Sequence, residues 1–301
     1  VFTWDSAAFP DPKGLMKDLA AMGIQTIPIV DPGVKVDPSY SVYVDGVEKD
    51  VFLRHATGAH VVGHVWPGES VHPDFTSPAA REWWGGQHRP LLLDAGVRGI
   101  WCDMNEPAVW GSAARVHDYA PDALHHDEGG CRTHREVHNV YGHMMSLAAR
   151  DGLLAARPDE RPFVLTRSGW AGMQRHTAVW TGDNRSCFGS MIVDLVHLLS
   201  LGMSGVAFAG ADVGGFQDDC HAELFTRWLE WGVFQPFCRA HAAWNTRRQE
   251  PWSFGEECED HSRRLISFRM SLLPYLYTQF VEASESGLPV MRPLVLQYPA
   301  D

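Results

Sequence analysis

Charged and polar side chains follow short apolar runs at six places in this 301-residue sequence. Two such runs are Arg98–Cys102 (RGIWC) and Thr177–Thr181 (TAVWT). The residues that follow the six runs are Asp31, Asp103, Asn105, Glu106, Arg167, Asp183, Asn184, Asp212, Arg239 and His241. Asp and Asn also cap helices that begin after strands, which explains one or two of these positions. The same arrangement after all six runs indicates one shared site.

The chemistry of these groups fits two kinds of site. Paired carboxylates beside aromatic rings suit cleavage of a glycosidic bond, in which one carboxylate attacks the sugar carbon and the other protonates the leaving oxygen. Clusters of carboxylates also bind divalent metals. The residue types alone leave both possibilities open.

Strands and helices alternate along the segments that must position these groups. The near-continuous apolar runs are typical of strands buried on both faces, and they are Ile24–Val30, Arg98–Cys102, Pro162–Thr166, Thr177–Thr181, Val206–Ala209 and Phe234–Phe237. Helices are expected at Pro12–Met22, Ser77–Ala95, His134–Ala156, Cys187–Leu201, His221–Gly232 and Glu257–Ser286. This order predicts an α/β fold built from βαβ units. In a (β/α)8 barrel, the polar residues above would all lie at the C-terminal ends of the strands, where active sites form.

One segment departs from this order. Residues Tyr40–Pro67 alternate between apolar and polar side chains, which predicts small antiparallel β-hairpins inserted after the first strand.

Composition limits the partners of the protein. A formal net charge of −12 disfavours binding to nucleic acid or to an anionic membrane surface. No apolar stretch reaches the ~18 residues of a membrane span. The six cysteines are scattered without a C-x-x-C pair, which favours a reduced, cytoplasmic environment. Because the first residue is Val1, we expect the chain to be a segment of a longer protein.

Motifs along the whole sequence resemble glycoside hydrolase family 31. WCDMNEP at residues 101–107 is similar to the nucleophile signature of that family. Further similar segments follow the order of the family, and they are FTWD and FPDPKGL (2–15), IPIVDPGVK (27–35), VWPG and PDFTSPAAREWW (65–84), HNVYGHMM (138–145), FVLTRSGWAGMQRHTAVWTGDN (163–184), FAGADVGGF (208–216), RAH and QEPW (239–252) and LLPYLY (272–277). The resemblance implies a retaining α-glucosidase that acts on α-glucosides or oligosaccharides.

The resemblance also implies roles for individual residues. Asp103 would be the nucleophile that forms a covalent glycosyl–enzyme, and Asp183 would be the general acid/base. Partial burial beside Trp180, together with a second carboxylate nearby, would raise the pKa of Asp183, as a general acid requires. A retaining mechanism places the two carboxyl groups ~5–5.5 Å apart. The residues implied to bind the sugar are Arg167, His241, Asp212, Trp101, Trp66, Phe216, Ile29 and Asp31.

Other roles remain open for some of these residues. Arg167 can pair with Asp103 as well as with a sugar hydroxyl, and Asp31 can form the turn before Pro-Gly. Glu106 is expected to orient its neighbours, and Trp180 is expected to support the site. The proposed chemistry requires neither cofactor nor metal.

The resemblance implies that two barrel strands precede residue 1. We therefore expect a partial barrel at residues 1–290, with an inserted hairpin subdomain at 40–68, and a connection at 291–301 toward a C-terminal β-domain. Because such a partial barrel exposes sheet edges, the isolated chain is expected to be unstable and nearly inactive.

Several competing functions remain open. α-Xylosidase and transglucosylase activities occur on the same scaffold. A non-catalytic sugar-binding relative would lack Asp103 or Asp183, and both are present. A metal-dependent hydrolase would need a ligand motif such as H-x-H at a strand end. His134 and His138 have the i, i+4 spacing of some metal ligands, although a solvated helix start is the expected role.

Overall fold

The computed structural model describes residues 1–110, 119–127 and 129–300. It divides into two compact units, Val1–Thr177 and Ala178–Asp301. The predicted domain bounds at residues 290 and 291 stay a prediction.

Three parallel strands form the centre of the first unit, namely β1 (Ile29–Val30), β5 (Gly99–Cys102) and β8 (Phe163–Thr166). Their register pairs Val30 with Cys102 and Cys102 with Thr166, so the three strands end side by side. Parallel strands need a long crossover, and helix α5 (Tyr141–Ala156), which contacts β5 and β8, provides the crossover between them.

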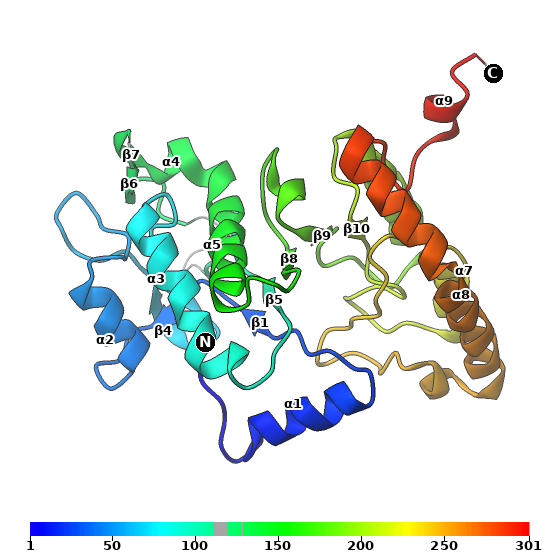
Figure 1. Cartoon of the computed structure of the whole chain (residues 1–301), viewed down its shortest axis with the longest axis horizontal. Coiled ribbons are helices and arrows are strands. Elements are labelled where there is room, and N and C mark those ends of the chain that lie inside the picture. The colour runs from blue at the N-terminus through cyan, green and yellow to red at the C-terminus, as the bar shows by residue number, and fades with distance from the viewer. Residues whose placement is uncertain (111–118, 128, 301) are drawn as a thin grey trace. The chain divides into compact units, whose positions relative to one another are not determined.

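Helix α3 (Pro78–His88) lies beside α5 (Figure 1). The two helices approach closely because glycines meet at their contact: a Cβ on Gly152 would lie only 2.4 Å from the carbonyl oxygen of Gly85. Aromatic side chains, including fully buried Trp84, Phe75 and Tyr141, fill the core of this unit.

The inserted segment of the first unit is only partly the predicted set of hairpins. Strands β3 (Val62–Val65) and β4 (Gly68–Val71) form a hairpin, and β2 (Val34–Lys35) pairs with β4. Residues Ser41–Glu48, however, form helix α2. Tertiary packing decides this conformation, because Phe52 packs against Gly46 and the indole of Trp83 donates a 2.6 Å hydrogen bond to Asp45.

The remaining elements of the first unit surround this centre. Helix α1 begins where Asp11 accepts a hydrogen bond from the backbone N–H of Gly14, as expected of an N-cap. The elements are α1 (Pro12–Ala21), the short π-helix Arg89–Leu93, the hairpin β6 (Leu124–Asp127) and β7 (Gly130–Thr133), α4 (His134–Val137) and the 3-10 turns His138–Val140 and Met173–Arg175.

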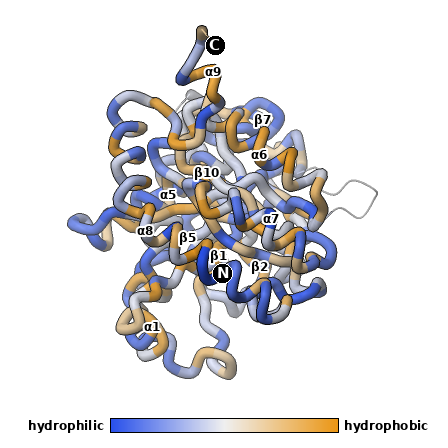
Figure 2. The backbone as a smooth tube through the Cα atoms, turned by 90° about the vertical axis from the view of Figure 1, so that its right-hand side faces the viewer, coloured by the Kyte–Doolittle hydropathy of each residue, from blue (hydrophilic) through white to orange (hydrophobic). Residues whose placement is uncertain are grey.

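The second unit contains two parallel strands, β9 (Ala178–Trp180) and β10 (Ala209–Gly210), joined by helix α6 (Phe188–Met203). Figure 2 shows the hydrophobic chain around β10 in orange. The other elements are α7 (Ala222–Gly232), the 3-10 turn Pro251–Phe254, α8 (Glu256–Ser286) and α9 (Leu294–Gln297). A second core gathers around Trp228, Phe225 and Leu224.

Three of the six predicted strands differ from expectation: the first, the fifth, which lies at Ala209–Gly210 instead of Val206–Ala209, and the sixth. The first is shortened to Ile29–Val30, and Ile24 and Ile27 are exposed; Pro28 has no N–H to donate to a sheet. Residues Phe234–Phe237 form no strand, because the guanidinium of Arg269 binds the carbonyl oxygens of Val233, Gln235 and Pro236. None of the helices in the described part of the chain is long and apolar enough to cross a membrane.

Candidate active site

Strand register brings three of the predicted residues together in the first unit. Asp31, Asp103 and Arg167 each follow directly after the last residue of β1, β5 or β8, and those last residues pair with one another. The backbone N–H of Arg167 also donates to the carbonyl of Cys102 at 3.2 Å. The ends of these parallel strands thus form one row of charged side chains.

Arg167 holds two carboxylates in this row. Its Nη1 lies 3.1 Å from Oδ1 of Asp103. Its Nε and Nη2 each donate a 2.8 Å hydrogen bond to one oxygen of Glu106. Bidentate pairs of this kind are among the stronger hydrogen bonds in proteins. The predicted roles of Glu106 in orienting Arg167 and of Arg167 as an ion-pair partner of Asp103 are therefore both present in the geometry.

The backbone after Asp103 has an uncommon conformation. Met104 has a φ of 54°, in the left-handed region that side chains other than glycine rarely adopt. In this conformation its N–H donates to Oδ1 of Asp103 at 2.9 Å, and its sulfur accepts from Arg167. Asn105 is fully buried and donates to the hydroxyl of Thr166 at 2.9 Å. The loop is thus tied to the neighbouring strand on both sides of Met104.

Asp31 lies in the same electrostatic environment. Burial, followed by the negative charge of Asp103, raises the pKa of Asp31 to about 6, while Arg167 acts in the opposite direction. Its Oδ1 is buried and has no hydrogen-bond partner among the described residues. An unpartnered buried oxygen is costly without a ligand or water, which favours the ligand-binding alternative for Asp31 over the turn.

Three apolar residues expected to bind the sugar, Ile29, Trp101 and Trp66, lie in the first unit. Ile29 pairs with Trp101 across β1 and β5, next to the row of charges. Trp66 lies at the turn between β3 and β4, 71% exposed, with its ring edge-to-face against Trp110 at 4.6 Å. The structure thus places Trp66 on a separate turn, and its role as a sugar platform stays a prediction.

The second unit carries the other predicted residues on the segments after β9 and β10. Asp183 follows β9 and is exposed, so the expected partial burial beside Trp180 is wrong. The cause is local: Trp180 is the last residue of the strand and only 3% exposed, whereas Gly182, with a φ of 89°, turns the chain outward before Asp183.

Asp212 is fully buried and paired with Arg239. The guanidinium Nε donates to Oδ1 at 2.5 Å and Nη2 lies 3.3 Å from Oδ2. Burial raises the pKa of Asp212 to about 7; Arg239 lowers it, and the nearby charge of Asp183 raises it further. Arg239 also stacks 4.8 Å above the ring of Trp180. Trp180 thus supports the site by packing against this arginine.

His241 and Phe216 form a stacked pair. Their ring centroids are 5.0 Å apart with planes inclined by 25°. Burial, followed by the positive charge of Arg239, lowers the pKa of His241 to about 4. The imidazole is therefore neutral near pH 7 and can both donate and accept a hydrogen bond, as binding of a sugar hydroxyl requires.

Two buried polar groups were not predicted from the sequence. Asp194 of α6 accepts hydrogen bonds from Thr181 and Asn184. In the sequence, the only indication of its role is that Asp194 is a single acidic residue in the apolar run MIVDLVHLL. The other group is a chain of hydrogen-bonded side chains in which His125 contacts Asp74 at 2.9 Å and His134 at 3.0 Å.

The solvated role expected for His134 is therefore wrong. This side chain is 3% exposed, because it packs between His125 and His138 inside the first unit. Its Nε2 lies 3.3 Å from Nδ1 of His138, so the two imidazoles bond to each other. Within the described residues, no group of three or more metal-ligating side chains has the arrangement of a metal site.

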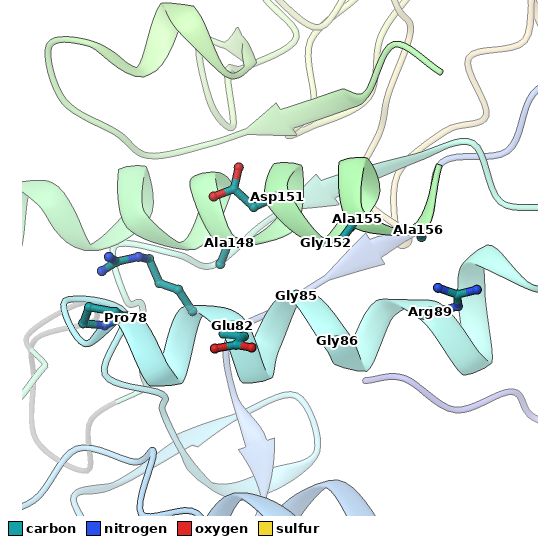
Figure 3. A pocket seen from close by; sticks show the side chains of 11 residues that line it. Pro78, Glu82, Gly85, Gly86, Arg89, Ala148, Asp151, Gly152, Ala155 and Ala156 are labelled. Carbon is teal, nitrogen blue, oxygen red and sulfur yellow. The ribbon is translucent and has the colours of Figure 1, made fainter. Parts of the chain in front are cut away.

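A groove of about 580 Å³ lies between α3 and α5, and it contains none of the predicted site residues (Figure 3). Its charges are mixed, with Arg81 and Arg89 opposed by Glu82 and Asp151. Arg81 is already used, since it donates to the carbonyl oxygens of Phe75 and Thr76. The candidate site described above therefore gains no residue from this groove.

Comparison with known families identifies the class of this fold. Residues 1–279 match the model of the glycosyl hydrolases family 31 TIM-barrel domain. The chain belongs to glycosyl hydrolase family 31, and the predicted α/β barrel class is confirmed.

Individual relatives are similar over the whole chain. "Alpha-glucosidase 2" of Bacillus thermoamyloliquefaciens is 48% identical over 301 residues, which cover 100% of this chain and 38% of that protein. The structure resembles that of the ER glucosidase II heterodimeric complex, with 39% identity and a TM-score of 0.93, over 100% of this chain and 33% of the other. It also resembles a family 31 alpha-glucosidase from Bacteroides thetaiotaomicron, with 42% identity and a TM-score of 0.87, over 100% of this chain and 48% of the other. The chain thus spans less than half the length of each of these proteins.

Proposed function

We propose that this chain is the catalytic portion of a retaining α-glucosidase that releases terminal α-linked glucose from α-glucosides and oligosaccharides. The observation that carries the proposal is Asp103, held at the end of β5 by the guanidinium of Arg167, 3.1 Å away, in a family 31 barrel domain. Its relatives named as α-glucosidases support glucose as the sugar.

In the first step, an oxygen of Asp103 attacks the anomeric carbon of glucose. The bond from this carbon to the glycosidic oxygen breaks, and Asp183 donates its proton to that oxygen. The Arg167 guanidinium stabilises the carboxylate form of Asp103 before the attack, because an adjacent cation favours the charged form of an acid. The product of this step is a covalent glucosyl–enzyme and a free leaving group.

In the second step, the ionised Asp183 takes a proton from water. The water oxygen attacks the anomeric carbon, and the bond to Asp103 breaks. Two inversions return the α-configuration. The exposed position of Asp183 suits both the departing sugar and the incoming water. The separation of Asp103 and Asp183 required by this mechanism stays a prediction.

His241, Phe216 and Asp212 would bind the glucose in the same proposal. The neutral imidazole of His241 offers one donor and one acceptor to hydroxyl groups, and Asp31 offers an unpartnered carboxylate oxygen. The cytoplasmic location expected from the cysteines belongs to this proposal as well, and fractionation of cells that express the protein would test it.

The whole encoded polypeptide should be assayed with aryl α-glucosides and aryl α-xylosides, following the product by NMR. We expect α-glucose as the first product and a preference for glucosides, with turnover lowered roughly 10⁴-fold or more in Asp103→Ala. A β-configured first product would overturn the retaining mechanism. A preference for xylosides would overturn the sugar assignment alone, and loss of activity with a chelator would favour the metal-dependent alternative.

A further inference from the structure

Helix α6 contributes a buried carboxylate to the loop that carries Asp183. Asp194 lies in the second turn of this helix and is 4% exposed. Its Oδ1 accepts a 2.8 Å hydrogen bond from the hydroxyl of Thr181, and its Oδ2 accepts a 2.6 Å bond from the amide of Asn184. These two donors stand on either side of Gly182 and Asp183, so one carboxylate fixes both ends of a two-residue segment.

The bond from Asn184 also sets the orientation of its side-chain amide. Because a carboxylate only accepts hydrogen bonds, the NH2 group must face Asp194, and it reaches the carbonyl of Asp212 at 3.1 Å as well. The amide oxygen then faces the backbone N–H of Phe216, which donates to it at 2.8 Å. Asn184 thereby joins the loop of Asp183 to the segment that carries Asp212 and Phe216.

The loop needs such support because its own backbone is permissive. Gly182 has a φ of 89° and no atom within 4 Å of where a Cβ would be. Glycine adopts many conformations at little cost, so Gly182 alone would leave the direction of Asp183 unspecified. The hydrogen bonds of Thr181 and Asn184 to Asp194 remove that freedom.

We propose that Asp194 is a positioning residue for the general acid/base, and that its two hydrogen bonds aim Asp183 at the glycosidic oxygen. This inference rests on the proposed function of Asp183. Burial raises the pKa of Asp194, whereas the bonds from Asn184 and Thr181 and the charge of His197 lower it. The geometry requires an acceptor at this position.

General-acid catalysis has a signature that a structural role lacks. Proton donation matters most when the leaving group is a poor one, such as a sugar alcohol, and little when it is fluoride or dinitrophenolate, which depart without a proton. A misdirected Asp183 therefore slows maltose far more than α-glucosyl fluoride. A general loss of folded protein slows both substrates equally.

The experiment compares Asp194→Ala, Asp194→Asn, Asp183→Ala and Leu198→Ala in the whole encoded polypeptide, with kcat/KM measured on maltose and on α-glucosyl fluoride. Leu198 is a matched control because it lies one turn further along α6 and is 2% exposed.

We expect Asp194→Ala to lower kcat/KM for maltose ~10–100-fold, which is a part of the 10²–10⁴-fold contribution of a general acid. The same variant should change kcat/KM for α-glucosyl fluoride less than about threefold. Leu198→Ala should lower both by the same factor.

The outcomes separate this inference from the proposed function. If Asp183→Ala affects maltose and the fluoride equally, the acid/base assignment fails, and the role of Asp194 fails with it. If Asp183→Ala is selective for maltose and Asp194→Ala is not, only the positioning role is overturned. Should Asp194→Ala fail to fold, Asp194→Asn decides: it keeps an acceptor but offers an NH2 group to one of the two donors, so a selective loss of about tenfold is expected. An unselective loss would overturn the proposal.

Discussion

The two proposed catalytic carboxylates, Asp103 in the first unit and Asp183 in the second, are supported by different physical means. In the first unit, one guanidinium, that of Arg167, contacts Asp103 and Glu106 at 3.1 and 2.8 Å. In the second unit, the loop of Asp183 is fixed through neutral donors, the hydroxyl of Thr181 and the amide of Asn184. The difference matches the two proposed roles. A nucleophile must remain ionised, which an adjacent cation favours, whereas an acid/base must both release and accept a proton.

The largest predicted effects come from removing the arginine of each unit. Arg239→Met leaves Asp212 buried at 0% exposure without its cation, so we expect the free energy of unfolding to fall by about 3–5 kcal/mol. Arg167→Met leaves Asp103 and Glu106 at 19% and 31% exposure, where water can solvate them, so stability should change by only about 1 kcal/mol. Activity should instead fall roughly 10²–10³-fold. Urea unfolding and kcat/KM measured on both variants test this contrast, and equal stability losses would contradict it.

A smaller effect is expected in how the free energy of unfolding depends on pH, and it arises from His88 in the first unit. His88 is fully buried, and burial lowers its pKa to about 4. Because the folded pKa lies below that of the unfolded chain, His88 costs no stability above about pH 6.5, and the free energy of unfolding falls progressively as the pH drops from about 6.5 to about 4. At pH 5 the loss from this residue should be roughly 2 kcal/mol. Urea unfolding at pH 7 and pH 5 should show a shallower pH dependence for His88→Met than for the unsubstituted protein. An unchanged dependence would show that His88 titrates normally.

The smallest predicted effect tests whether helix α5 supports the loops that carry Asp103 and Arg167. Gly142 lies in the first turn of α5, where a Cβ would be 2.7 Å from the carbonyl oxygens of both Asn105 and Ser168. Gly142→Ala should therefore destabilise the protein by about 1–2 kcal/mol and displace the loops that carry Asp103 and Arg167. We expect kcat/KM to fall about tenfold, since small misplacements in a site are costly.

Gly86→Ala in α3 is the matched control for Gly142→Ala. No atom lies within 4 Å of the new Cβ, so the substitution should stabilise the helix by up to about 1 kcal/mol and leave activity unchanged. If the two variants had equal activity, the contact between α5 and the site loops would not position the carboxylates.

The sequence was sufficient for positions set by local chemistry. Asp103 and Arg167 lie at adjacent strand ends as expected, because apolar runs end where parallel strands meet the loops. Helix α1 begins at Pro12 as predicted, and the residue before it, Asp11, caps it through a local hydrogen bond. The short runs at Gly99–Cys102 and Phe163–Thr166 are strands with little change of bounds.

Positions set by distant partners could not be predicted in this way. The pattern at Ser41–Glu48 alternates like a strand, yet contacts with Phe52 and Trp83 make it a helix. The segment Phe234–Phe237 forms no strand, because the side chain of Arg269, more than thirty residues away, binds the backbone carbonyl oxygens that a neighbouring strand would otherwise bind. Asp194 was missed because its donors are separated from it by ten residues or more.

Trapping of the covalent intermediate tests the central claim most directly. A 5-fluoro-α-glucosyl fluoride forms the glucosyl–enzyme quickly and releases it slowly, so the labelled peptide can be identified by mass spectrometry after digestion. We predict one label, on Asp103, in the peptide that contains WCDMNEP, and no label in Asp103→Ala. A label on Asp31 or Glu106, or turnover without any covalent adduct, would contradict the assignment of Asp103 as the nucleophile of a retaining enzyme.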